Sequence, residues 1–228
     1  MIKNILKKKI LEKEKEGNIT GKHKFDNAIS WAKDIIDNES KENAIIMLDY
    51  MMETIRNDLK YSFLTEIIYS PRFQTLNITR KTFIPEFYVD EKGNKVNVTN
   101  RLNKKINLRN DTIIVVPYRR ERKRNAIVYL KNNIFKYMED NHMGKYYELV
   151  DITYIYNGIH SISSGVELGK DNDITVKEVV NIVELFPNIH TDGIEWINSH
   201  SNKSIYEVID FRIAILFELA RLKYNIFI

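Results

Sequence analysis

Apolar residues recur every three or four positions over the first third of the chain. This spacing places them on one side of a helix and predicts amphipathic helices at residues 2–16, 25–38 and 40–69. Two glycines between the first two segments are expected to separate them. Pro71 should follow the end of the third helix, because the residue before a proline avoids helical geometry. Residues 1–70 are therefore expected to form a helical region.

Beyond Pro71 the pattern changes to short runs that are typical of strands. Residues 82–90 and 95–99 flank a turn that contains Gly93, which predicts a hairpin. The polar residues 100–111 are expected to be a connector. Residues 112–117 (TIIVVP) form a continuous apolar run, which predicts a strand buried on both faces.

A strand, a turn, a short helix and a second strand are expected between Tyr147 and Val180. The helix should begin at His160 and end near Gly169, and a length of this kind suits two parallel strands bridged by a helix. A final, largely apolar helix is expected from about Ser204 to Lys223.

Together these patterns predict an α+β fold. In it an N-terminal helical region (residues 1–70) precedes a small mixed β-sheet with helices (residues 71–228), which the C-terminal helix closes. The two parts form either separate domains or one compact unit.

Composition narrows the class of protein. Apolar residues make up 43% of the chain and charged residues 29%, which is typical of soluble globular proteins. The absence of cysteine excludes disulfides, thiolate nucleophiles and cysteine-based zinc sites. The longest apolar runs are too short to cross a membrane, and no signal peptide is expected at the N-terminus. We therefore expect a cytoplasmic protein with no membrane partner.

The net charge of +4 is mild, but positive residues cluster directly after the buried 112–117 run. Five of the six residues from 119 to 124 are basic: Arg119, Arg120, Arg122, Lys123 and Arg124. Arginines at a strand-to-helix junction suit bidentate binding of phosphate. Cations at a helix N-terminus are also unfavourable unless an anion is present. The alternative is a helix start whose charges face water.

The turn Asn157-Gly158, followed by Ile159, His160 and Ser161, is the second candidate anion site. The first backbone N–H groups of a helix lack partners within the helix and can hold an anion. Gly158 allows a ligand to approach the backbone closely, and His160 and Ser161 carry groups that bond anions or transfer protons. The alternative is that His160 caps its own helix.

Other constellations are weaker. His142 lies in an expected loop without a visible partner, so we expect it to be exposed rather than a general base. The histidines lack metal-ligand spacing, and no metal site is expected. No nucleophile elbow, Walker A loop or dinucleotide-binding glycine motif is present.

These segments resemble the ParB/sulfiredoxin superfamily over Thr112–Ile182. Ile113–Arg120 resembles that superfamily's first, arginine-bearing box. Gly158-Ile159-His160-Ser161 resembles the second box, Gly-x-x-Arg or Gly-x-His-Arg, which opens a helix and binds nucleotide phosphates. Ser161 stands where the superfamily usually has arginine. The segments YIYNGIHSISSG, HTDGIEW and DFRIAILFELARL also resemble a family of uncharacterised bacterial and phage proteins.

The resemblance implies a phosphate site made by Arg119, Arg120, Asn157, Gly158, His160 and Ser161. The ligand would be a nucleotide, with or without Mg²⁺, and any hydrolysis or phosphoryl transfer would use His160. The alternative is a non-catalytic factor from a phage or mobile element that binds nucleic acid or a host protein through the basic residues 119–124. The serine at position 161 favours this alternative.

Overall fold

The computed structural model describes the backbone of residues 2–79 and 81–228, and the side chains from Thr20 onward except those of residues 73, 76, 79 and 80. The chain forms the expected mixed α+β fold, with a helix at its C-terminal end. None of the helices among the described residues is long and apolar enough to span a membrane.

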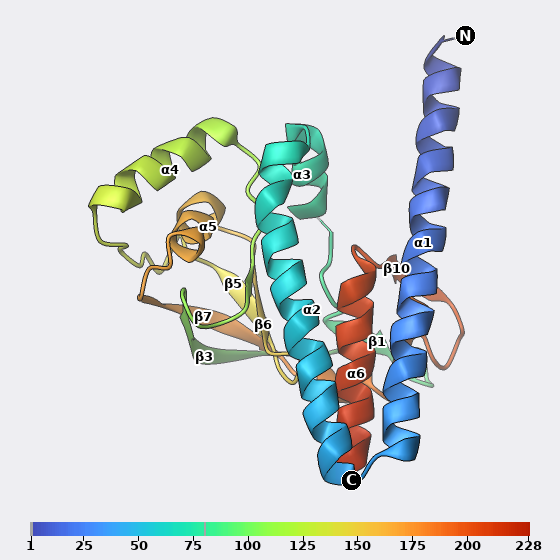
Figure 1. Ribbon diagram of the computed structural model, residues 1–228. Helices are drawn as coiled ribbons and strands as arrows, with labels where there is room; N and C mark the ends of the chain where they lie inside the picture. The colour runs from blue at the N-terminus through green and yellow to red at the C-terminus, as the bar shows by residue number, and fades with distance from the viewer. Residues whose placement is uncertain (1, 80) are drawn as a thin grey trace.

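Three long helices pack side by side, as Figure 1 shows: α1 (Ile2–Asn38), α2 (Lys41–Tyr69) and α6 (Phe211–Phe227). The Ser40 hydroxyl caps α2 by accepting a hydrogen bond from the Asn43 backbone N–H. The expected break at Gly17 and Gly21 is wrong, because α1 is continuous there. A single glycine weakens a helix by only about 1 kcal/mol, which neighbouring turns can offset. The packing of the predicted 2–16 amphipathic face lies outside the described side chains.

The main sheet has five strands in the order β3-β7-β5-β6-β4. Its members are β3 (Thr99–Asn107), β4 (Ile113–Ile114), β5 (Gly144–Tyr147), β6 (Ile152–Ile155) and β7 (Asp173–Val180). Between them the chain forms α4 (Arg120–Asn132) and α5 (Ile159–Glu167). Figure 1 shows α4 and α5 on one side of this sheet and α2 on the other.

Alternate residues of the sheet strands point to opposite faces and pack in two separate hydrophobic cores. Ile114 and Val116 face the core shared with the long helices, whereas Ile113 and Val115 pack with α4 and α5. The prediction that this run is buried on both faces is confirmed. The core shared with the long helices contains residues from both sides of position 70, and the division into residues 1–70 and 71–228 stays a prediction.

Smaller elements complete the chain. The predicted hairpin is present as β1 (Phe87–Val89) and β2 (Lys95–Asn97), and Gly93 has the positive φ of 84° that its turn requires. A short helix, α3 (Arg72–Thr79), precedes these two strands. A 3-10 turn at Ile182–Leu185 follows β7. A second small sheet joins β8 (Ile189–Thr191), β9 (Glu195–Asn198) and β10 (Ser204–Glu207).

Three further expectations are wrong. The polar segment 100–111, which was expected to be a connector, is mostly strand β3. Because β3 is an exposed edge strand, its sequence lacks the alternation of apolar and polar residues that marks a half-buried strand. Strands β6 and β7 are not a parallel pair, because β5 lies between them, antiparallel to β6 and parallel to β7. Residues 204–207 form strand β10, and the last helix begins only at Phe211, where the Asp210 carboxylate caps it.

Candidate functional site

The structure brings Arg119 and His160 together, although they lie 41 residues apart in the sequence. The Arg119 backbone N–H donates a hydrogen bond of 3.0 Å to Nε2 of His160, and the imidazole lies edge-on to the Tyr118 ring. Since Nε2 accepts, the proton of the neutral imidazole sits on Nδ1. We call the group Tyr118, Arg119, Arg122 and His160 the α4–α5 corner.

The α4–α5 corner holds two arginines, Arg119 and Arg122, whose guanidinium groups form no ion pair among the described residues. Burial and three nearby cations lower the pKa of His160 to about 4. These cations are the side chains of Arg122, Lys123 and Arg119. Nε of Arg119 is buried and has no hydrogen-bond partner among the described residues. His160 is therefore neutral at physiological pH and surrounded by positive groups.

Arg120 does not join this corner. Its guanidinium donates hydrogen bonds to the carbonyl oxygens of Ile67, Ile68 and Ser70, at the C-terminal end of α2. The last carbonyls of a helix lack partners within the helix and carry partial negative charge, so a cation stabilises them. Arg120 thus ties α4 to α2.

We expect Arg120→Ala to lower the free energy of unfolding by about 1 kcal/mol, because three carbonyls lose a charged donor but can turn to water. Urea unfolding would measure the loss. Arg122→Ala is the control: its exposed side chain forms no ion pair within the described part of the chain, so a change within about 0.5 kcal/mol is expected. Equal losses in both variants would contradict the assignment.

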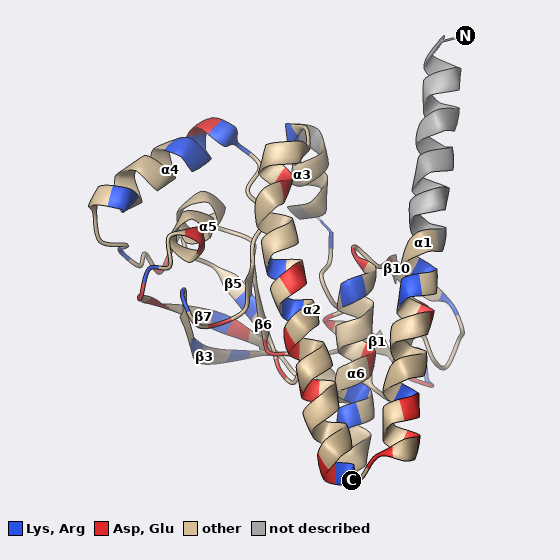
Figure 2. Ribbon diagram, viewed as in Figure 1, with Lys and Arg blue, Asp and Glu red and all other residues tan. Residues whose placement is uncertain are grey.

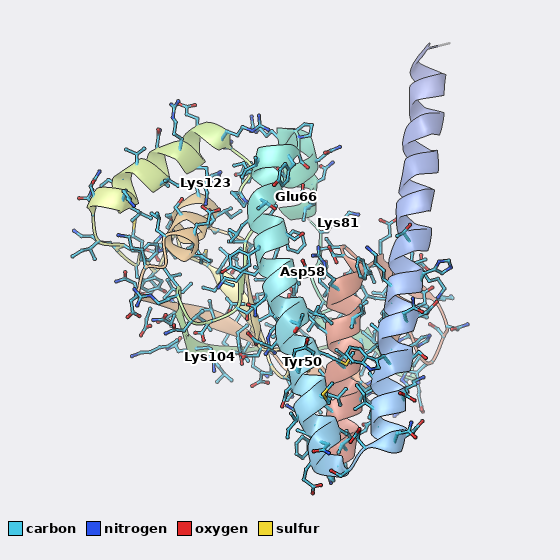
Figure 3. All side chains as sticks on the ribbon, viewed as in Figure 1. Tyr50, Asp58, Glu66, Lys81, Lys104 and Lys123 are labelled. Atoms are coloured by element: carbon cyan, nitrogen blue, oxygen red, sulfur yellow. The ribbon has the colours of Figure 1, made fainter. Side chains whose placement is uncertain are left out.

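Lys123 is also a structural residue. Its side chain is only 7% exposed, and its ammonium contacts the Glu167 carboxylate at 2.6 Å and donates to the Ser163 hydroxyl at 2.9 Å. Figure 3 shows Lys123 between α4 and α5. Burial lowers the pKa of Lys123, and Glu167 opposes that shift. Of the basic run, Arg119, Arg122 and Arg124 therefore remain for a ligand.

His142 is buried, which makes the expected exposed loop histidine wrong. Its Nδ1 accepts from the Met138 backbone N–H, so Nε2 carries the proton and donates to the Ser161 hydroxyl at 2.9 Å. Ser161 in turn donates to the Gly158 carbonyl oxygen. Burial lowers the pKa of His142, which stays neutral. These hydrogen bonds, from Met138 through His142 to Ser161, connect the segment before β5 to the first turn of α5.

The groups that approach the Gly158 backbone closely are His142 and Asn141 of the protein itself. Gly158 has a φ of 69°, and a Cβ added there would lie 2.5 Å from Cδ2 of His142. Asn157 accepts a bond from the Gly158 N–H and approaches the Met143 sulfur. The side chains of Asn157 and Ser161 thus shape the turn, while the first N–H groups of α5 have no acceptor within the helix.

A second polar cluster was not predicted from the sequence. The ammonium of Lys145 contacts the carboxylates of Glu86 at 2.5 Å and Glu178 at 3.3 Å, and the Tyr156 hydroxyl donates to Glu178. Burial alone would lower the pKa of Lys145, but the two carboxylates outweigh it and raise that pKa. Burial and Glu178 raise the pKa of Tyr156. The four residues come from separate segments, so no local motif marks them.

No group of three histidine or acidic side chains suited to a metal ion occurs among the residues whose side chains are described. The model of a family described as "Family of unknown function (DUF6710)" matches residues 10–228. The chain therefore belongs to the DUF6710 family. No curated protein and no solved structure matches it. The resemblance to the ParB/sulfiredoxin superfamily stays a prediction.

Proposed function

We propose that this DUF6710 protein binds a phosphate-bearing ligand, most simply a nucleotide, at the α4–α5 corner. The observation that carries the proposal is the position of Arg119, whose backbone N–H bonds to His160 and whose buried Nε has no hydrogen-bond partner among the described residues. Burial, together with the nearby cations, lowers the pKa of His160 to about 4. Like charges held together repel one another, and an anion between them removes that cost. The first turn of α5 adds backbone N–H donors beside the cations.

The order of elements supports the same proposal. Pro117 and Arg119 lie between β4 and α4, and Gly158 and His160 lie at the start of α5. This is the order of the two boxes in the ParB/sulfiredoxin resemblance. The serine at position 161 donates to Gly158 and offers no cation to a transferred phosphoryl group. We therefore propose ligand binding as the function, and hydrolysis or phosphoryl transfer is not required.

His160 has a positioning role in this proposal. Its Nε2 accepts from the Arg119 backbone, which holds the start of α4 against α5. A group with a pKa of about 4 carries almost no proton at pH 7, so it is a poor general acid there. The arginine side chains, rather than the imidazole, would supply charge to the ligand.

The pKa of His160 itself tests the proposal. NMR titration of the free protein is expected to show His160 protonating only near pH 4. Adding ATP, CTP or inorganic pyrophosphate, each with and without Mg²⁺, should raise that pKa, because a bound anion stabilises the imidazolium form. The direction separates this site from a merely buried histidine. An unchanged pKa with every one of these ligands would contradict the proposal.

Paired variants locate the ligand. Arg119→Ala and Arg122→Ala should each weaken nucleotide binding about tenfold, equivalent to about 1.4 kcal/mol. Arg124→Ala is the matched control, because Arg124 is not among the cations that shift the pKa of His160. His160→Gln preserves an acceptor for the Arg119 backbone and should bind more tightly than His160→Ala. Isothermal titration calorimetry would compare all five variants.

The alternative function is binding of nucleic acid through the outward side of α4. Arg122, Arg124 and Tyr129 are exposed there, and Figure 2 shows basic residues along this helix. Phosphate contacts make affinity fall with salt at a log–log slope of about −0.9 per contact on B-DNA. Such binding should depend on Arg122 and Arg124 together and be indifferent to His160→Gln. A host protein in place of nucleic acid would show no such slope.

A further inference from the structure

A cavity of about 670 Å³ lies against β3, β5 and β7, beside the cluster around Lys145. This volume is in the range of cavities that hold small molecules, roughly 300–1,000 Å³. The Arg119 and His160 side chains do not line it, so the cavity is separate from the α4–α5 corner.

The wall of the cavity is a row of charges that alternate in sign. Arg101 on β3 is paired in register with Glu178 on β7, and Glu178 is paired with Lys145 on β5. Lys145 then contacts Glu86, which lies just before β1. The row contains two cations and two carboxylates, so it carries no net charge at neutral pH.

The remaining charged groups are almost balanced as well. Lys177 and Glu139, which also line the cavity, form an ion pair with each other. Asp140 alone adds a further negative charge. A strongly charged ligand, whether a polyphosphate or a polyamine, would therefore meet repulsive groups as well as attractive ones. The wall favours an uncharged ligand.

The same wall is rich in groups that form hydrogen bonds. Carboxylates accept, Arg101 and Lys145 donate, and the amides of Asn97 and Asn103 do both. A hydroxyl group donates and accepts at once, so adjacent hydroxyls can satisfy neighbouring carboxylates and amides without adding charge. The Tyr156 ring, 37% exposed, offers a flat apolar surface beside them.

We propose that this cavity binds an uncharged, polyhydroxylated molecule whose adjacent hydroxyl groups bond to Glu178, Asn103 and Arg101. A free sugar and the ribose of a nucleoside share this chemistry. Binding places the ligand across β3 and β7, with one face on Tyr156. The walls contributed by β3 and β7 belong to one sheet, so the site exists before the ligand arrives.

The test is ligand-detected NMR saturation transfer on the full chain. The probes are common mono- and disaccharides, the four ribonucleosides and their 2′-deoxy counterparts, together with spermidine and pyrophosphate as charged probes. We expect signal from one or more sugars or ribonucleosides. Ribonucleoside binding that is lost in the 2′-deoxy form identifies ribose as the source, whereas binding by free sugars alone identifies a carbohydrate.

Variants connect any signal to the cavity. Asn103→Ala should weaken binding at least fivefold, and Lys105→Ala should leave it unchanged, because Lys105 is also exposed on β3 but does not line the cavity. Glu178→Gln, checked for folding by circular dichroism, should weaken binding in the same way. The proposal is overturned if no uncharged probe binds, if only spermidine or pyrophosphate binds, or if Asn103→Ala binds as the native chain does.

Discussion

Replacing Gly158 by alanine is expected to lower the free energy of unfolding by about 3 to 4 kcal/mol. Two costs combine. A residue with a Cβ pays roughly 1–2 kcal/mol to adopt the left-handed φ of 69°. The new methyl group would also lie 2.5 Å from Cδ2 of His142 and 2.7 Å from the Asn141 carbonyl oxygen, and overpacking of this kind costs about 1–3 kcal/mol. Because the Asn141 backbone is one of the obstacles, a rotamer change cannot relieve it.

Gly169 provides the matched control at the other end of the same helix. Its φ is 59°, and a Cβ there would meet nothing within 4 Å. Gly169→Ala should therefore show the conformational cost alone, about 1–2 kcal/mol. Thermal and urea unfolding of both variants would isolate the contact with His142 as the difference. Equal losses would mean that the turn and the 138–143 segment do not pack as closely as described.

Removing the ammonium of Lys123 should be almost as damaging. Lys123→Ala is expected to cost about 3 kcal/mol, since breaking a buried ion pair leaves one charge without its partner. The Glu167 side chain is 30% exposed and can be partly hydrated, which places the loss at the lower end of the usual range. The loss should appear in urea unfolding of the ligand-free chain.

The exposed neighbour Arg124 is the control for Lys123. Arg124→Ala should change the free energy of unfolding by less than about 0.5 kcal/mol. The double variant Lys123→Met/Glu167→Gln should recover at least half of the loss, because it removes the unpaired carboxylate and keeps an apolar stem. If Lys123→Ala were as stable as Arg124→Ala, the ammonium could not be buried between α4 and α5.

Elements that bury a regular apolar pattern were predictable from the sequence. Helix α2, the buried 112–117 run that contains the two-residue strand β4, and the hairpin around Gly93 follow from local rules of periodicity and turn chemistry. Strand β3 was not predictable in this way. It lies at the sheet edge and is exposed along most of its length, so its side chains carry no alternation to detect.

The candidate site shows the same division. The structure places the Arg119 backbone against His160, and the phosphate site predicted at these residues stays a prediction. The partners of Arg120 and Lys123 could not be inferred, because they lie on α2 and α5 and one-dimensional patterns do not identify contacts between elements. Within the basic run, Arg120 thus connects α4 to α2 and Lys123 connects α4 to α5. The side chains of Arg119, Arg122 and Arg124 are left to contact a ligand.

The position of α6 has a consequence for how the chain folds during synthesis. This helix packs against both α1 and α2, and eight successive residues from Ile213 to Ala220 are buried. It is translated after all the other described elements. The apolar sides of α1 and α2 therefore stay incompletely covered while the sheet is being made, and the largest core closes only when α6 leaves the ribosome. Until then, the nascent chain exposes apolar surface of α1 and α2 that α6 covers in the folded protein.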